Sequence, residues 1–294
     1  MAQILQGDVV AREVLDSVSQ RVSRLRDTNG VDACLAVVLV GHDPASEIYV
    51  RRKQKAARSV GIRSLEYRLD EETSQQGLLD LVHKLNADPA VHGILVQLPL
   101  PSHIAGDVIL GAIAPQKDVD GFHPVNVGRL STGAGGGLVP CTPLGCVMLL
   151  ERVIDDFRGL KAVVIGKSNI VGKPAALLLL DRECTVTVTH IHTRGLPDIA
   201  RSADIIIAAA GSPRLVRGDW VKPGAVVIDV GINRIALEDG TSAIVGDVAL
   251  DECDHAAVIT PVPKGVGPMT IACLLKNTVH AAEAMARARE PAVQ

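Results

Sequence analysis

The stretch that most constrains the fold covers residues 161–174. Four apolar residues lead into Gly166, and Gly172 follows six residues later, in front of the apolar run 175–180. This pattern predicts a buried parallel strand, a tight turn and then the start of a helix. The free amides and positive dipole end of such a helix form a phosphate site. Because the spacing is not G-x-G-x-x-G, the loop alone fits a plain strand-to-helix turn as well as a nucleotide site.

Length and composition indicate the class of protein. At 294 residues the chain has room for two domains, and its 47% hydrophobic content supplies sizeable cores. A formal net charge of -3 and an aromatic content of 2% indicate neither nucleic acid nor an anionic membrane as partner. No apolar run approaches the roughly 20 residues that span a bilayer, and the first residues lack a signal-peptide pattern. We therefore expect a soluble, cytoplasmic protein.

Cysteine and histidine positions give no metal site. The six cysteines are scattered without a C-x-x-C pair, so reduced core thiols are expected rather than disulfides or bound zinc. His190 and His192 stand at metal-ligand spacing on one face of a predicted strand, but no carboxylate or cysteine set completes a site. We therefore predict no metal.

Strands and helices alternate along the chain, which predicts parallel strands joined by right-handed crossovers. The first part is expected to contain helices near 8–26, 46–60 and 74–86, and strands near 34–40, 62–69 and 91–98. A glycine-rich link at 131–137 then precedes Thr142, a predicted helix N-cap, with Pro143 at the first helical position.

The second part repeats the alternation as a Rossmann-type, doubly wound parallel sheet. Its strands are expected near 161–166, 184–190, 203–209, 225–230 and 256–260. A last helix, near 269–287, is long enough to return to the first domain. We predict an α/β protein with a first domain at 1–139, joined by residues 269–294, and a cofactor domain at 140–268.

The residues after the second strand of this sheet favour NADP over NAD. An NAD-binding fold usually places an acidic residue about 20 positions beyond the glycines, where it binds the ribose 2′-hydroxyl. Here that region has no acid but contains His192, Thr193 and Arg194. Together with Lys167 and Ser168 in the glycine loop, these side chains suit a 2′-phosphate. The alternative is that they are solvated loop residues.

Chemically active candidates lie in the first part. Tyr49 and Lys53 are four residues apart on a predicted helix and share a face. Gln97 ends an apolar strand, and Asp118 and Asp120 lie in a polar loop. Each alone fits a plainer reading, as a solvated charge, a strand cap or a turn former. Together at strand ends, a lysine, an amide and an acid suit acid–base chemistry.

Seven ordered motifs carry a resemblance to a known family. They are Tyr49-Val-Arg-Arg-Lys53, Gly93-Ile-Leu-Val-Gln-Leu-Pro-Leu-Pro101, Lys117-Asp-Val-Asp-Gly-Phe-His-Pro124, Pro140-Cys-Thr-Pro143, Gly166-Lys-Ser-Asn-Ile-Val-Gly-Lys-Pro174, Gly246-Asp-Val248 and Gly265-Val-Gly-Pro-Met-Thr270. In this set the chain closely resembles the bifunctional methylenetetrahydrofolate dehydrogenase/methenyltetrahydrofolate cyclohydrolase family (the bacterial FolD type), over nearly its whole length. The resemblance implies two α/β domains flanking a cleft and a homodimer formed through the cofactor domain.

The resemblance also implies two linked reactions. NADP⁺ oxidises 5,10-methylenetetrahydrofolate to the methenyl cation, and water then converts this cation to 10-formyltetrahydrofolate. Lys53 would be the general acid/base of the hydrolysis, held by Gln97, while Tyr49 would stack on the pterin and Asp120 would accept from its amino-pyrimidine edge. Further substrate positions would be Val96, Leu98, Pro263, Gly265, Val266, Gly267 and Pro268, and further cofactor positions Gly166, Lys167, Ser168 and Ile232.

One position departs from the family pattern, because Lys264 stands where the family usually has glycine. If the backbone there requires a positive φ, the loop must shift. Otherwise, Lys264 would meet the polyglutamate tail of the substrate or the cofactor phosphates.

Other functional classes stay open at this stage. One is a shikimate-type NADP-dependent dehydrogenase, and another is a nucleotide-binding module without turnover. A folate dehydrogenase that lacks the cyclohydrolase activity is a third.

Overall fold

The computed structural model describes residues 1–237 and 241–288. The chain divides into two compact units, each assembled from two separate stretches. One unit comprises Met1–Ala11 and Thr142–Thr270, and we call it the six-stranded unit after its main sheet. The other comprises Arg12–Cys141 and the described residues from Ile271 onward, and we call it the three-stranded unit.

The three-stranded unit is built on a parallel sheet of order β3-β2-β4. These strands are β3 (Arg63–Leu69), β2 (Cys34–Val40) and β4 (Gly93–Val96). Every residue of β2 is buried, as expected for the central strand of a parallel sheet covered on both faces. Apolar side chains of α3 (Gln75–Ala87) and α4 (Gly106–Ala112) form one core with β2 and β4, and α2 (Pro44–Ser59) packs against β2 and β3.

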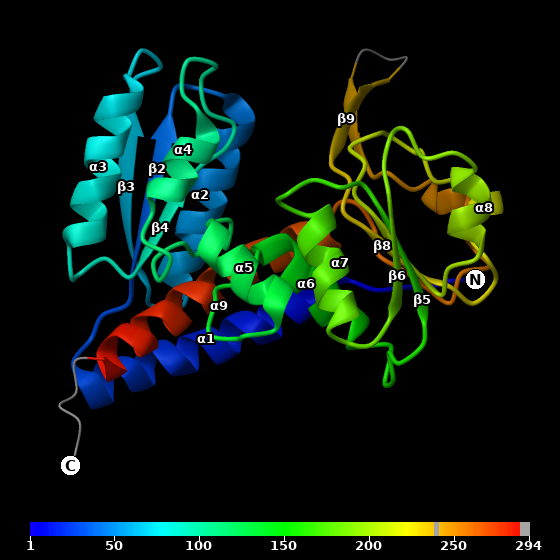
Figure 1. The fold of residues 1–294 in the computed structure, drawn as a ribbon, viewed down its shortest axis with the longest axis horizontal. Helices are drawn as coiled ribbons and strands as arrows, with labels where there is room; N and C mark the ends of the chain where they lie inside the picture. Colours follow the sequence, from blue (N-terminus) through cyan, green and yellow to red (C-terminus); the bar gives the residue numbers. More distant parts are fainter. Residues whose placement is uncertain (238–240, 289–294) are drawn as a thin grey trace. The chain divides into compact units, whose positions relative to one another are not determined.

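Two long helices and a short one complete this unit. Residues from Arg12 of α1 (Gly7–Asn29) and from Ile271 of α9 (Val266–Arg287) belong to it, together with α5 (Pro124–Thr132). Arg21 of α1 donates two hydrogen bonds to the Glu283 carboxylate of α9, at 2.9 and 2.7 Å. The prediction that the last helix returns to the first part of the chain is therefore confirmed (Figure 1).

The six-stranded unit contains an all-parallel sheet of order β1-β11-β8-β7-β5-β6. Its strands are β1 (Gln3–Ile4), β5 (Lys161–Ile165), β6 (Thr185–Thr189), β7 (Ile205–Ala208), β8 (Val226–Asp229) and β11 (Val258–Ile259). Its helices are α6 (Cys141–Leu150), α7 (Gly172–Leu180), α8 (Leu196–Arg201) and the short 3-10 turns Gly218–Trp220 and Leu250–Glu252. The strand order reverses at β5, which lies between β6 and β7, so ligands are expected beyond the carboxyl ends of β5 and β7.

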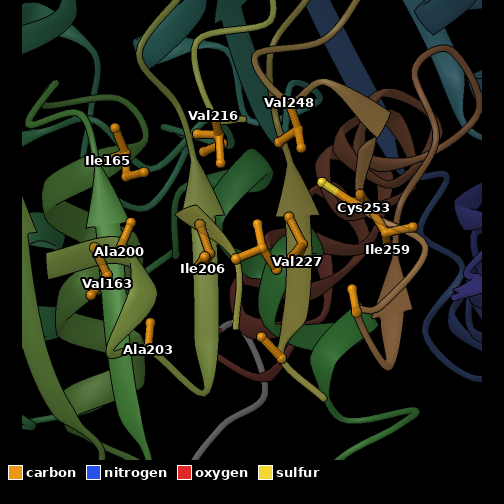
Figure 2. Packing of buried hydrophobic residues seen from close by; sticks show 14 residues of the cluster. Val163, Ile165, Ala200, Ala203, Ile206, Val216, Val227, Val248, Cys253 and Ile259 are labelled. Atoms are coloured by element: carbon orange, nitrogen blue, oxygen red, sulfur yellow. The ribbon is translucent and has the colours of Figure 1, made fainter. Parts of the chain in front are cut away.

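Figure 2 shows the apolar layer that supports this sheet. Val163 and Ile165 of β5, Ile206 of β7 and Val227 of β8 face the same core as Ala200 of α8. Because side chains alternate along a strand, these residues share one face of the sheet, and their burial packs that face against α8.

The sequence prediction missed two pairings. Residues 3–4 form β1, which pairs in parallel with β11, although so short a segment carries no strand pattern of its own. Strands β9 (Asn233–Ala236) and β10 (Ser242–Val245) form an antiparallel ribbon with alternating exposure. Both are short, and their stability depends on partners that the local pattern does not reveal.

The N-cap prediction for Thr142 was wrong. Helix α6 already begins at Cys141, so Thr142 and Pro143 lie inside its first turn. The Thr142 hydroxyl instead shares a hydrogen bond of 2.9 Å with the Thr270 hydroxyl at the start of α9. The helix near 46–60 begins at Pro44, because the Asp43 carboxylate caps it by accepting from the backbone N–H of Ser46 at 2.7 Å.

All six cysteine side chains are buried, as expected for core thiols. Within the described part of the chain, the membrane-spanning criterion of a long, continuously apolar helix is not met.

Candidate active site

Helix α2 and the end of β4 bring Lys53 and Gln97 together. Lys53 Nζ donates to Gln97 Oε1 at 3.0 Å, and Gln97 Nε2 donates to the Leu98 carbonyl at 2.6 Å. Lys53 is only 7% exposed, which is unusual for a lysine on a surface helix. The reading of Lys53 as a solvated charge is therefore wrong. Tyr49, one turn earlier on α2, is half-buried, and burial raises the pKa of its hydroxyl.

Asp120 lies within the electrostatic field of this lysine. Burial raises the pKa of the Asp120 carboxyl, the positive charge of Lys53 opposes that shift, and the negative charge of Asp118 adds to it. The Cys141 thiol donates to the carbonyl of Val119, the residue before Asp120, at 3.2 Å. The three-stranded unit thus collects a lysine amino group, an amide and a carboxylate at one place, which is a set of groups able to bind a polar heterocycle and to transfer protons.

The glycine loop of the six-stranded unit has the close approaches that its sequence predicts. Gly166 has φ +119, and a Cβ there would lie 2.1 Å from the Ala209 carbonyl oxygen. A Cβ on Gly172 would lie 2.0 Å from the Gly166 carbonyl oxygen. Neither position therefore has room for a side chain, because the loop backbone packs closely on neighbouring backbone at the switch point of the sheet.

The start of α7 differs from the prediction in one respect. Ser168 Oγ accepts from the backbone N–H groups of Val171 and Gly172 at 3.1 and 3.3 Å, and the Lys173 N–H donates to the Ser168 carbonyl at 3.0 Å. These amides were expected to be free for a phosphate. They are instead used within the loop, while Lys167 and Ser168 remain exposed at its rim.

The residues predicted to meet a 2′-phosphate follow β6 in a tight turn. His190 N–H donates to Thr193 Oγ1 at 2.9 Å, and the Thr193 N–H donates back to the His190 carbonyl at 2.8 Å. His192 and Arg194 are exposed on this turn. Because Ile165 pairs with Thr189, the turn lies at the same sheet edge as Gly166. The two histidines lie after the strand and not on it, with ring centroids 6.0 Å apart.

Ile232 follows β8 at the same edge. It is 52% exposed, so its side chain is available to a ligand there. In residues 1–237 and 241–288 we find no group of three or more acidic, histidine or cysteine side chains arranged to hold a metal ion.

Comparison with known proteins identifies the family. The tetrahydrofolate dehydrogenase/cyclohydrolase catalytic-domain model matches residues 5–120, and the NAD(P)-binding-domain model of the same family matches residues 140–286. The chain belongs to the tetrahydrofolate dehydrogenase/cyclohydrolase family. Since the family models and the relatives agree, the alternative of a shikimate-type dehydrogenase is not supported.

Relatives and solved structures of this family match along almost the whole chain. The bifunctional protein FolD 2 of Rhizorhabdus wittichii is 65% identical over 96% of this chain and 95% of its own length. The bifunctional FolD of Campylobacter jejuni has a TM-score of 0.92 at 50% identity, covering 97% of this chain and 99% of that one. The Trypanosoma brucei enzyme, solved with NADP and an inhibitor, has a TM-score of 0.91 at 40% identity, covering 98% and 99%.

The family loop at residues 263–268 leads into α9. Pro263 and Lys264 are exposed, whereas Gly265 and Val266 are buried, and Gly267 and Pro268 are half-buried in the first turn of the helix. Lys264 has φ +81, the left-handed region that glycine tolerates. The lysine therefore occupies a positive-φ position, at a cost of about 1 kcal/mol relative to glycine.

Sequence reasoning missed the side chains that hold the loop of Asp120. That loop was expected to be a polar segment, and within it Lys117 and Asp118 are buried. The Asp118 carboxylate accepts from the backbone N–H groups of Gly121 and His123 and from Asn126 Nδ2, at 3.2, 2.7 and 2.9 Å. Lys117 Nζ donates to backbone carbonyls at the end of α3, those of residues 85, 86 and 88.

Asn277 of α9 contributes to the same loop from far along the chain. Its Nδ2 donates to the carbonyls of Val119 and Val139 at 2.8 and 2.9 Å. Val119 directly precedes Asp120, so Asn277 helps to fix the Asp120 backbone. A lone asparagine in an apolar helix was the one signal in the sequence for this contact.

Proposed function

We propose that this protein is a bifunctional enzyme of one-carbon folate metabolism. It oxidises 5,10-methylenetetrahydrofolate to 5,10-methenyltetrahydrofolate with NADP⁺ and hydrolyses the methenyl product to 10-formyltetrahydrofolate. The observation that carries this proposal is the hydrogen bond of buried Lys53 to Gln97, close to Asp120, in a chain 65% identical to a relative named bifunctional FolD.

The proposed chemistry assigns one role to each of these side chains. Asp120 accepts hydrogen bonds from the amino-pyrimidine edge of the pterin, and Tyr49 stacks on the ring. Gln97 holds the Lys53 amine in one orientation through its 3.0 Å hydrogen bond. Leu98 and the backbone of Val96, whose side chain is buried in the core, line the folate. The loop residues Pro263, Gly265, Val266, Gly267 and Pro268 contribute further substrate contacts.

Hydrolysis then follows from a positioned amine. As the oxygen of a water bonds to the methenyl carbon, Lys53 accepts a proton from that water. The bond between the methenyl carbon and N5 of the folate breaks, N5 takes a proton, and the formyl group stays on N10. One proton is released overall. In the other reaction, bound NADP⁺ supplies the hydride acceptor.

The cofactor assignment rests on the edge of the sheet where its strand order reverses. The loop from Gly166 to Gly172 lies at this edge with its glycines packed on neighbouring backbone, and Lys167 and Ser168 are exposed on its rim. We propose that His192, Thr193 and Arg194 bind the 2′-phosphate, which selects NADP over NAD, and that Ile232 contacts the cofactor. No metal takes part in the proposal.

We further propose which residues carry each site, that the protein forms a homodimer, and that it is cytoplasmic. Residues 1–139, with 269–294, would carry the folate site, and residues 140–268 the cofactor site. A cytoplasmic homodimer would form through the cofactor domain. Its support is the open edge strand β6, where Val188 is 41% exposed and the adjacent Ile191 92% exposed. Sedimentation equilibrium tests it, and a monomer at micromolar concentration would reject it.

The first test is a spectrophotometric assay with 5,10-methylenetetrahydrofolate and NADP⁺, repeated with NAD⁺. Reduced cofactor with little lasting methenyl absorbance would support both activities. Methenyl product that accumulates one-for-one with NADPH would reject the cyclohydrolase activity and leave a monofunctional dehydrogenase. No reduced cofactor with either nucleotide would reject the dehydrogenase activity. Lys53→Ala should abolish hydrolysis, whereas Lys55→Ala, at an exposed position on the same helix, should not.

Lys264 is proposed to contact the polyglutamate tail of the substrate. It is exposed at the substrate loop, and an ammonium group there matches the tail's carboxylates. Lys264→Gly and Lys264→Asn both tolerate the positive φ and remove the charge. Both should raise the KM for polyglutamyl substrate more than for monoglutamyl substrate. An unchanged ratio of the two KM values would reject the contact.

A further inference from the structure

Two buried carboxylates lie at the edge of the six-stranded sheet where its parallel strands have their C-terminal ends. Asp229 ends β8 and is 2% exposed, and Asp247 follows β10 and is 0% exposed. Within the described residues, neither carboxylate forms a salt bridge. Burying an ionised carboxyl without a counter-charge is costly unless it is well hydrogen-bonded. Both carboxylates are instead held by hydrogen-bond donors, four on Asp247 and three on Asp229.

Asp247 collects donors from two separate loops. Its Oδ2 accepts from the backbone N–H groups of Ala210 and Gly211 at 2.6 and 2.8 Å. Its Oδ1 accepts from the Ser212 N–H at 3.0 Å and from Asn233 Nδ2 at 2.8 Å. The first three donors lie in the loop after β7, and Asn233 begins β9, directly after the β8 loop. One side chain therefore holds both loops.

Asp229 holds the backbone around Asp247 through hydrogen bonds. Its Oδ1 accepts from the N–H groups of Gly231 and Asp247, both at 2.9 Å, and its Oδ2 accepts from the Val248 N–H at 3.0 Å. The two glycines beside the pair have no room for a side chain. A Cβ on Gly246 would lie 1.8 Å from Asp229 Oδ2, and one on Gly231 would lie 2.3 Å from Asp247 Oδ1.

These contacts meet both ends of the proposed cofactor site. Gly166 packs directly on the Ala209 carbonyl, and Ala209 immediately precedes the amides that Asp247 holds. Ile232 lies between Gly231, which donates to Asp229, and Asn233, which donates to Asp247. Asp229 thus holds the backbone N–H of the residue before Ile232, and Asp247 holds the side-chain amide of the residue after it.

We infer that Asp247, supported by Asp229, is a positioning residue for the dinucleotide cofactor. Asp247 sets the separation of the Gly166 loop and Ile232 and does not touch the cofactor itself. This inference rests on the proposed function, because it concerns the same NADP site. It explains the Gly246-Asp-Val248 motif, to which neither proposed reaction gives a role.

The test compares Asp247→Asn with Asp204→Asn. An amide at position 247 presents its NH₂ group to backbone donors whichever way it is turned, so the loops must move. Asp204 is the control, because it also accepts from a backbone N–H of this sheet, that of Lys161 at 2.8 Å, but at the opposite edge, where it also pairs with Lys222. Titration calorimetry with NADP⁺ should give a Kd raised at least about tenfold for Asp247→Asn and within about twofold of wild type for Asp204→Asn.

Kinetics separate positioning from a loss of folded protein. The KM for NADP⁺ should rise with the Kd in Asp247→Asn, while the KM for 5,10-methylenetetrahydrofolate changes less than about threefold. A folded Asp247→Asn protein with wild-type Kd and KM for NADP⁺ would overturn the inference. If that variant does not fold, Asn233→Ala removes a single donor, and an unchanged Kd there would overturn it equally. If the wild-type protein does not bind NADP⁺, the cofactor assignment under the proposed function is wrong instead.

Discussion

A single added methyl group at Gly7 tests how the start of the chain supports the loop before α9. Gly7 is the buried first residue of α1, and an added Cβ would lie 1.9 Å from the Gly265 carbonyl oxygen and 2.6 Å from its carbonyl carbon. These are backbone atoms, so no side-chain rotation relieves the contact. The next residue, Asp8, donates its N–H to the Lys264 carbonyl at 3.1 Å. Gly7→Ala must therefore push the loop away from the helix start.

The expected cost follows from three contributions. Overpacking a buried site costs about 1–3 kcal/mol, and losing the Asp8 hydrogen bond costs about 1 kcal/mol. Alanine offsets up to about 1 kcal/mol of this cost, because it loses less backbone entropy than glycine on folding. The net destabilisation is about 2 kcal/mol, which corresponds to a Tm lower by about 4–8 °C.

The assay uses the chain's single tryptophan, Trp220, which lies in the same unit as Gly7. Its fluorescence reports thermal or urea unfolding of that unit. The control is Gly128→Ala in α5, an exposed position with no atom within 4 Å of the added Cβ. There the same substitution should raise stability, measured by circular dichroism, by about 0.5–1 kcal/mol. If Gly7→Ala leaves the Trp220 transition at the wild-type value, the predicted clash is refuted.

Three further predictions concern buried polar groups. Gln97→Leu removes the acceptor 3.0 Å from Lys53 Nζ. Hydrolysis of the methenyl substrate should then slow about a hundredfold, because the amine is no longer oriented. Turnover at the wild-type rate would show that Gln97 does not orient the amine. Burial raises the pKa of Asp229 from 3.8 to about 6, so the folded protein binds this proton more tightly than the unfolded chain does. The group therefore stabilises the fold below pH 3.8, and about 3 kcal/mol is lost as the pH rises through 6. In urea unfolding between pH 4 and 7, Asp229→Asn should lack this loss, and equal pH slopes would contradict the assignment. Asn277→Ala leaves two backbone carbonyls around Asp120 without their amide donor. It should destabilise the protein by about 2 kcal/mol in thermal unfolding and raise the KM for the folate. An unchanged KM would show that Asn277 does not support the substrate site.

Much of the fold could be predicted because its signals are local. The buried run of β2 and the strand–glycine–helix pattern at β5 and α7 each occupy one short window of sequence. Cofactor candidates follow from the same logic, since ligands of a doubly wound sheet lie beyond its strand ends. Such predictions depend only on period and turn chemistry.

The candidate site was predictable in its members but not in its supports. Gln97 stands out because it ends an apolar strand, and Lys53 because it shares a helix face with Tyr49 four residues earlier. Their hydrogen bond of 3.0 Å, and the burial of Lys53, come from the packing of α2 on the sheet. Asn277 lies 158 residues from the carbonyl it binds at Val119, a pairing that no local pattern contains.

By itself, the sequence determined the alternation of strands and helices, the glycine positions that admit close backbone approach, and the polar residues able to carry chemistry. Only the tertiary structure decided which distant segments meet. It placed β1 beside β11 and joined the loops after β7 and β8 through Asp247. It also put Lys264 at φ +81. The physical reason is that periodicity reflects burial within one element, whereas buried polar groups must find their partners wherever packing of the whole unit brings a donor or acceptor.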